Sequence, residues 1–98
     1  MRVDGTWTAL VTPFNPDLTV DIEGLRKLVE FQIKNSITGV LPVGTTGESP
    51  TLSWDEHRNV VDEVISVSKG KRPVLAGSGS NSTSEALEIS KHSDELGA

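Results

Sequence analysis

Apolar and polar residues follow two periodicities along the chain, one typical of strands and one typical of helices. Residues 6–14 (TWTALVTPF) are rich in β-forming residues and close on a proline, which predicts a short strand. From Asp21 the apolar residues recur at helical spacing, and Asp21 is a suitable N-cap. The apolar face of this helix comprises Ile22, Leu25, Leu28, Val29 and Ile33. We expect the helix to end near Asn35.

The alternation continues with a second strand and helix. Residues 39–43 (GVLPV) form a near-continuous apolar run, as expected of a strand buried on both faces. Pro42 lacks a backbone donor, so we place it close to the end of that strand. Ser53–Glu56 has the capping-box pattern and opens a second helix, which should end near Lys69–Gly70.

A third pair of elements closes the chain. Residues 73–76 (PVLA) predict a strand that runs into the glycine- and serine-rich segment 77–80. Ser82–Glu85 reads as a second capping box opening a helix, with Gly97 as its expected C′ residue.

Strands that alternate with helices predict an α/β fold with right-handed crossovers and a parallel sheet. A lone three-stranded parallel sheet would leave both edges unpaired and one face uncovered. We therefore interpret residues 1–98 as an incomplete part of a larger barrel or sheet, built from three successive strand–helix units.

Composition narrows the possible functions. The chain has no cysteine, which excludes a disulfide framework and thiolate metal sites, and its two histidines show no ligand spacing. A net charge of −5 argues against a nucleic-acid partner, because phosphate binding needs clustered cations. No apolar stretch approaches the length of a membrane span, and no signal-peptide pattern opens the chain. We expect a cytoplasmic protein without a metal.

The loops after the strands carry the candidate chemistry, because α/β folds place their sites at the carboxyl ends of the strands. In the segment 44–48, Gly44 and Gly47 allow a close backbone approach, while Thr45 and Thr46 offer adjacent hydroxyls and amides. Such groups bind a small carboxylate or relay a proton. The alternative is a polar turn whose threonines satisfy local backbone groups.

The segment 77–80 (GSGS) resembles a phosphate-cradling turn before a helix. It lacks the Walker pattern, and Ser82 stands where the third glycine of GxGxxG would be. A tight turn with close backbone packing is the favoured interpretation, and a small anion-binding domain is the alternative.

Four segments together resemble the opening of the dihydrodipicolinate synthase family. They are TALVTPF, GVLPVGTTGES, LSWDEHRNVV and PVLAGSGSNSTSEA, and they extend through essentially the whole chain. The wider superfamily includes N-acetylneuraminate lyases and 2-keto-3-deoxy sugar-acid aldolases, all (β/α)8 TIM barrels. The resemblance implies that residues 1–98 are the first three βα units of such a barrel, and the paired threonines lean toward the synthase branch.

The resemblance also implies a class I pyruvate-dependent lyase that needs no cofactor. Such an enzyme forms a Schiff base between a lysine and pyruvate, then condenses the enamine with an aldehyde, aspartate-semialdehyde in lysine and diaminopimelate biosynthesis. None of the five lysines of this chain sits at a strand end, so we expect the segment to lack the nucleophile and to be inactive alone. Homodimers or homotetramers are typical of the family.

Individual roles follow from the same resemblance. Thr45 is similar to the family threonine of a proton relay, which makes it the candidate catalytic residue. Thr46 matches the threonine that binds the pyruvate carboxylate, and Gly44 and Gly47 hold the loop as further substrate-binding positions.

A regulatory site is also implied, because some members bind lysine as a feedback inhibitor. His57, Asn81 and Glu85 match positions that bind it, whereas Pro50 and Trp54 depart from one common form. Two other interpretations stay open: a sugar-acid aldolase or N-acetylneuraminate lyase, and a non-catalytic α/β module that oligomerises.

Overall fold

The computed structural model describes residues 2–98. In chain order the elements are β1 (Trp7–Ala9), α1 (Ile22–Lys34), β2 (Gly39–Leu41), a 3₁₀ turn (Ser49–Thr51), α2 (Trp54–Ser68) and α3 (Thr83–Leu96). The three predicted helices are therefore present, and two predicted strands are present in shortened form.

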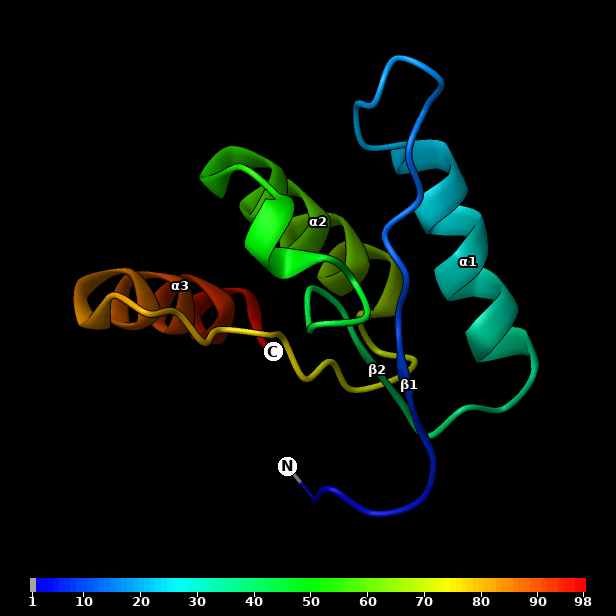
Figure 1. Ribbon diagram of the computed structural model, residues 1–98. Helices are drawn as coiled ribbons and strands as arrows, with labels where there is room; N and C mark the ends of the chain where they lie inside the picture. The colour runs from blue at the N-terminus through cyan, green and yellow to red at the C-terminus, as the bar shows by residue number, and fades with distance from the viewer. Residues whose placement is uncertain (1) are drawn as a thin grey trace.

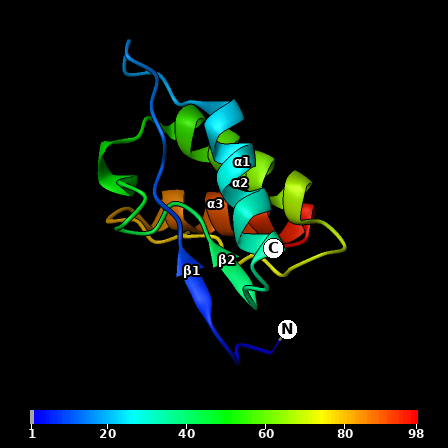
Figure 2. The ribbon, with the colours of Figure 1, turned by 90° about the vertical axis from the view of Figure 1, so that its right-hand side faces the viewer.

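The sheet described by the structure consists of β1 and β2, which run parallel and side by side (Figure 2). Trp7 pairs with Gly39, where an added β-carbon would lie 2.4 Å from the indole ring. β1 is shorter than the predicted strand 6–14. One further bond joins the Leu10 amide to the Leu41 carbonyl, and the next residue of the second run, Pro42, has no amide to donate.

The third predicted strand, residues 73–76, is not confirmed as a strand. The segment lies beside β2 and forms an isolated parallel bridge between Val40 and Val74. Bonds join the Val40 amide to the Pro73 carbonyl (3.2 Å) and the Leu75 amide to the Val40 carbonyl (3.0 Å). In a regular parallel ladder residue 42 would donate next, but Pro42 has no N–H, so the ladder is interrupted.

The helix ends confirm most of the predicted caps. Asp21 accepts a hydrogen bond from the Gly24 amide at 2.9 Å, and both bonds of the Ser53–Glu56 capping box are formed. Gly97 ends α3 in the left-handed conformation at φ 98°. The second predicted capping box is wrong.

The Ser82 hydroxyl makes no cap bond and instead contacts the Ser84 hydroxyl. The Glu85 carboxylate accepts from the Ser80 hydroxyl rather than from the amide of Ser82. The Ser80 side chain also accepts from that amide, so it engages both groups of one capping-box bond, the Ser82 amide and the Glu85 carboxylate.

The helices form a row in which α2 lies between α1 and α3 (Figure 1). The chain extends 34 × 34 × 20 Å, so it is a flattened unit. Its apolar core joins the first strand exit to the inner faces of α1 and α2 and to the second and third apolar runs. The buried members are Leu10, Leu25, Val29, Val40, Val43, Val60, Val61, Val64, Ile65 and Val74.

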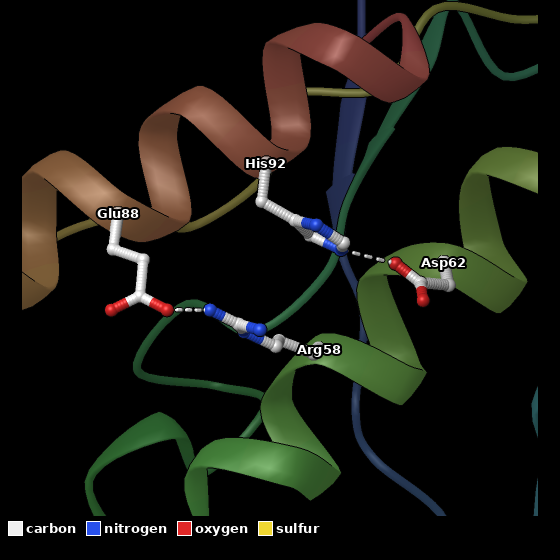
Figure 3. A network of polar contacts seen from close by, with 4 residues as sticks. All are labelled: Arg58, Asp62, Glu88 and His92. Atoms are coloured by element: carbon white, nitrogen blue, oxygen red, sulfur yellow. Dashed lines mark hydrogen bonds and ion pairs between the residues drawn. The ribbon is translucent and has the colours of Figure 1, made fainter.

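Charged pairs join neighbouring helices of this row. Arg26 of α1 pairs with Glu63 of α2. Between α2 and α3, Arg58 pairs with Glu88, and the His92 ring lies 2.6 Å from an Asp62 carboxylate oxygen (Figure 3). None of the helices within residues 2–98 has the length and apolar character that crossing a membrane requires.

Candidate functional site

The loop that leaves β2 is a sequence of tight turns. The Gly47 amide donates to the Gly44 carbonyl and the Glu48 amide to the Thr45 carbonyl, each at 3.0 Å. Val43 and Glu48 flank these turns at φ 50° and 61°. A β-branched residue in the left-handed region is strained, and Val43 is held there with its side chain 2% exposed. The surrounding packing therefore fixes the start of the loop.

The two threonines of this loop are exposed, and their hydroxyls make no hydrogen bond to any residue among 2–98. The alternative role, in which Thr45 and Thr46 satisfy local backbone groups, is therefore not supported by the side-chain contacts. A free hydroxyl both donates and accepts, so each is available to a ligand. Gly44 and Gly47 lie on either side of the pair and carry the first turn.

Thr12 holds the loop from the neighbouring strand exit, a contact that the sequence did not predict. Its hydroxyl donates to the Gly47 carbonyl at 2.7 Å, and the side chain is buried. Gly47 is also packed tightly, since an added β-carbon would lie 3.1 Å from the Leu10 carbonyl oxygen. The only sequence signal was a threonine, followed by Pro13, inside an apolar run.

The exit of the third apolar run also meets this loop. The Gly77 amide donates to the Pro42 carbonyl at 3.0 Å, and an added β-carbon on Gly77 would lie 2.3 Å from the Val43 carbonyl oxygen. Close backbone packing is thus the role of this glycine, as favoured from the sequence. The Glu85 carboxylate accepts from Ser80 at 2.7 Å, which places negative charge in the segment and disfavours anion binding there.

The three residues with an expected regulatory role lie together in a cavity apart from the Gly44–Glu48 loop. His57, Asn81 and Glu85 line one cavity of about 700 Å³ between the start of α2 and the segment before α3. The other lining residues are Ser49, Pro50, Leu52, Trp54, Gly79, Ser80 and Ser82. Thr45 and Thr46 do not line it, so the two sets of candidate residues occupy separate positions.

His57 is the buried titratable group of this cavity. Its side chain is 3% exposed and stacks on Trp54, with 5.5 Å between the ring centroids. Burial lowers the pKa of His57 below its ordinary 6.5, and the Gly77 backbone carbonyl partly offsets this effect. Its Nδ1 is buried and has no hydrogen-bond partner among residues 2–98.

All five lysines are exposed, and none follows a strand. A Schiff-base lysine requires a desolvated or cationic surrounding that lowers its pKa, and these positions offer neither burial nor a place at the loop. The lysines are Lys27 and Lys34 on α1, Lys69 and Lys71 after α2, and Lys91 on α3. The described residues also contain no group of three or more acidic or histidine side chains able to hold a metal ion.

Comparison with known proteins gives one consistent family. The profile of the dihydrodipicolinate synthetase family matches residues 2–98. A 4-hydroxy-tetrahydrodipicolinate synthase of Rhodopseudomonas palustris is 56% identical over 94 residues, which are 96% of this chain and 31% of the relative. The synthase of Methanococcus vannielii is 52% identical over 96 residues, 98% of this chain and 33% of the relative. The chain thus spans about a third of the length of the curated relatives it matches.

Solved structures agree with the sequence comparison. A chloride-inhibited dihydrodipicolinate synthase from Acinetobacter baumannii, complexed with pyruvate, superposes with a TM-score of 0.94 at 44% identity, covering 99% of this chain and 33% of that one. An N-acetylneuraminate lyase from Mycoplasma synoviae superposes with a TM-score of 0.89 at 31% identity, covering 94% and 32%. The α/β arrangement of this chain is therefore common to part of both kinds of enzyme.

Proposed function

Because this chain belongs to the dihydrodipicolinate synthetase family, we propose that it is part of a 4-hydroxy-tetrahydrodipicolinate synthase that condenses pyruvate with aspartate-semialdehyde. The observation that carries the proposal is the Gly44–Glu48 loop, which presents two exposed threonine hydroxyls without a partner among residues 2–98. The similar synthase from Acinetobacter baumannii is complexed with pyruvate, which supports pyruvate as a ligand of the whole protein.

The two threonines take different roles in this proposal. Thr46 binds the pyruvate carboxylate through its hydroxyl and its amide. Thr45 relays a proton, since a hydroxyl can accept one proton while donating another. Gly44 and Gly47 shape the turn on which both sit, and the buried contact from Thr12 keeps the turn in place.

The reaction requires an amine nucleophile. A lysine amine attacks the carbonyl carbon of pyruvate, and loss of water leaves a Schiff base. Removal of a proton from the methyl carbon then gives an enamine, whose carbon forms the new bond to the aldehyde carbon of aspartate-semialdehyde. The five lysines of this chain are exposed and none follows a strand, so we place the nucleophile in another part of the whole protein.

The same proposal gives the architecture of the whole enzyme. We interpret residues 1–98 as the first three βα units of a (β/α)8 barrel, with residues 73–76 as its third strand. The Val40–Val74 bridge and the common exit edge of the strands support this interpretation. A homodimer or homotetramer in the cytoplasm is the proposed state, and the mass of the native full-length protein in solution tests the assembly.

A regulatory role is proposed for the second cavity. His57, Asn81 and Glu85 bring a ring nitrogen, an amide and a carboxylate to one volume of about 700 Å³. A carboxylate beside neutral hydrogen-bonding groups suits a cationic amino acid, and lysine is the proposed ligand. Calorimetric titration of the full-length protein with lysine tests this assignment, and Glu85→Gln is expected to weaken binding because it removes the charge.

The closest competing activity is cleavage of a sugar acid. It is disfavoured by similarity, since the lyase structure is 31% identical while the three synthases cited above are 56%, 52% and 44% identical. A direct comparison separates the two: the full-length protein is incubated either with pyruvate and aspartate-semialdehyde or with N-acetylneuraminate. We expect turnover only in the first case. Turnover of the sugar acid alone would replace the proposal, and turnover of neither would support a non-catalytic module.

A further inference from the structure

We propose that Thr12 is a positioning residue of the active site, which holds the Gly44–Glu48 loop in the conformation that presents Thr45 and Thr46 to pyruvate. This inference rests on the proposed function. Thr12 lies at the exit of β1 and has no place in the chemistry itself, so its effect on the reaction passes through the loop. The contact that carries the inference is the hydrogen bond from the Thr12 hydroxyl to the Gly47 carbonyl, 2.7 Å long and buried.

The Gly47 carbonyl needs this donor because the local chain cannot supply one. Around it the backbone follows a 3₁₀ pattern, in which each carbonyl accepts from the amide three residues later. The Glu48 carbonyl accepts from Thr51 and the Ser49 carbonyl from Leu52. For Gly47 the corresponding residue is Pro50, which has no N–H. Among residues 2–98 the Thr12 hydroxyl is the one donor to that carbonyl.

The surroundings make the loop dependent on this bond. Gly47 is buried, so its carbonyl cannot turn to water when the donor is lost. The loop starts at Val43 in a strained left-handed conformation, which relaxes unless neighbouring contacts oppose it. Thr45 and Thr46 lie between these two points and have no side-chain contact of their own among residues 2–98. The backbone on either side therefore sets the orientation of these two side chains.

A purely structural role for Thr12 makes a different prediction. If the bond only stabilised the fold, its loss would lower the unfolding temperature and leave the folded enzyme with unchanged kinetics. If the bond positions the loop, the folded enzyme itself binds pyruvate less well and turns it over more slowly. The Michaelis constant for pyruvate, measured well below the unfolding temperature, separates these cases.

The experiment uses the full-length protein with Thr12→Val, which keeps the shape and removes the hydroxyl, and Thr12→Ser, which keeps the hydroxyl. We expect Thr12→Val to reduce kcat/KM for pyruvate by about tenfold or more, with a raised KM, since small misplacements of binding groups cost one to two orders of magnitude. Thr12→Ser should stay within about threefold of the wild type, because its hydroxyl can make the same bond.

A second matched pair covers the case in which Thr12→Val does not fold. Thr12→Ala and Thr12→Ser differ only by the hydroxyl, and the same difference in KM is expected between them. Wild-type kinetics in Thr12→Val, or equal losses in Thr12→Ala and Thr12→Ser, would overturn the positioning role. Failure of the wild-type protein to form a borohydride-trapped adduct with pyruvate is a separate result, which would overturn the proposed function and this inference with it.

Discussion

Gly77 passes so close to Val43 that a β-carbon added to Gly77 would lie 2.3 Å from the Val43 carbonyl oxygen. The neighbouring hydrogen bond, from the Gly77 amide to the Pro42 carbonyl at 3.0 Å, holds the two segments at this separation. The start of the candidate site loop is therefore covered directly by backbone that leaves the third apolar run. The two backbone segments can approach this closely because Gly77 has no side chain.

Replacing Gly77 with alanine should disturb this contact, because both partners are backbone and neither can rotate away. We expect the free energy of unfolding of the full-length protein to fall by about 1–3 kcal/mol, as for other overpacked sites. Denaturant unfolding measures it. Gly79→Ala is the matched control, since an added β-carbon there meets nothing within 4 Å. Equal stability of the two variants would contradict the packing role of Gly77.

The two serines that precede α2 and α3 should respond differently to replacement. Ser53 accepts from the Glu56 amide at 3.2 Å, whereas Ser82 makes no cap bond. Ser53→Ala should therefore cost about 1 kcal/mol of unfolding free energy, and Ser82→Ala only a few tenths. Chemical denaturation of both variants provides the test, and a larger loss for Ser82→Ala would refute the assignment of the caps.

Arg58 and Glu88 join α2 to α3 across a partly exposed surface (Figure 3). A double-mutant cycle with Arg58→Met and Glu88→Gln should give a coupling energy of roughly 0.2–1 kcal/mol, the range of exposed ion pairs. The coupling should shrink in 1 M salt, where the screening length is about 3 Å. A coupling of zero at low salt would show that the pair does not stabilise the contact between these helices.

His57 gives the stability of the protein a defined pH dependence. Burial lowers the pKa of His57 below 6.5, so the unfolded chain takes up this proton at a higher pH than the folded protein does. The stabilisation from the neutral ring is therefore present above pH 6.5 and is lost as the pH falls through the lowered pKa. NMR titration of the ring protons, assigned with His57→Asn, should give a midpoint below 6.5. A midpoint at or above 6.5 would contradict the lowered pKa of His57.

Sequence patterns predicted the features that depend on residues close together in the chain. The Asp21 cap, the Ser53–Glu56 capping box and the left-handed Gly97 each need only a few neighbouring residues, and all three were predicted correctly. The prediction of a second capping box at Ser82–Glu85 was wrong, also because of a residue close by in the chain. Ser80 takes both the Glu85 carboxylate and the Ser82 amide, and the S-x-x-E pattern does not register a competing serine two residues earlier.

Features that depend on residues far apart in the chain could not be predicted from such local patterns. The contact from Thr12 to Gly47 spans 35 positions, and no periodicity relates the two. The interruption of the third strand depends on Pro42, which lies in the neighbouring apolar run rather than in the segment itself. The loop at Gly44–Glu48 was found because its residue types are unusual. Its unpartnered hydroxyls could be established only once the surrounding side chains were placed.

The measurement that tests the central claim most directly is borohydride trapping of the full-length protein over a series of pyruvate concentrations, followed by intact mass analysis. The account predicts a covalent pyruvate adduct on the wild type that saturates with concentration. It also predicts that Thr46→Val needs at least about tenfold more pyruvate for half-maximal trapping, since it loses a charge-assisted hydrogen bond. An absent adduct on the wild type, or an unchanged concentration dependence in Thr46→Val, would contradict it.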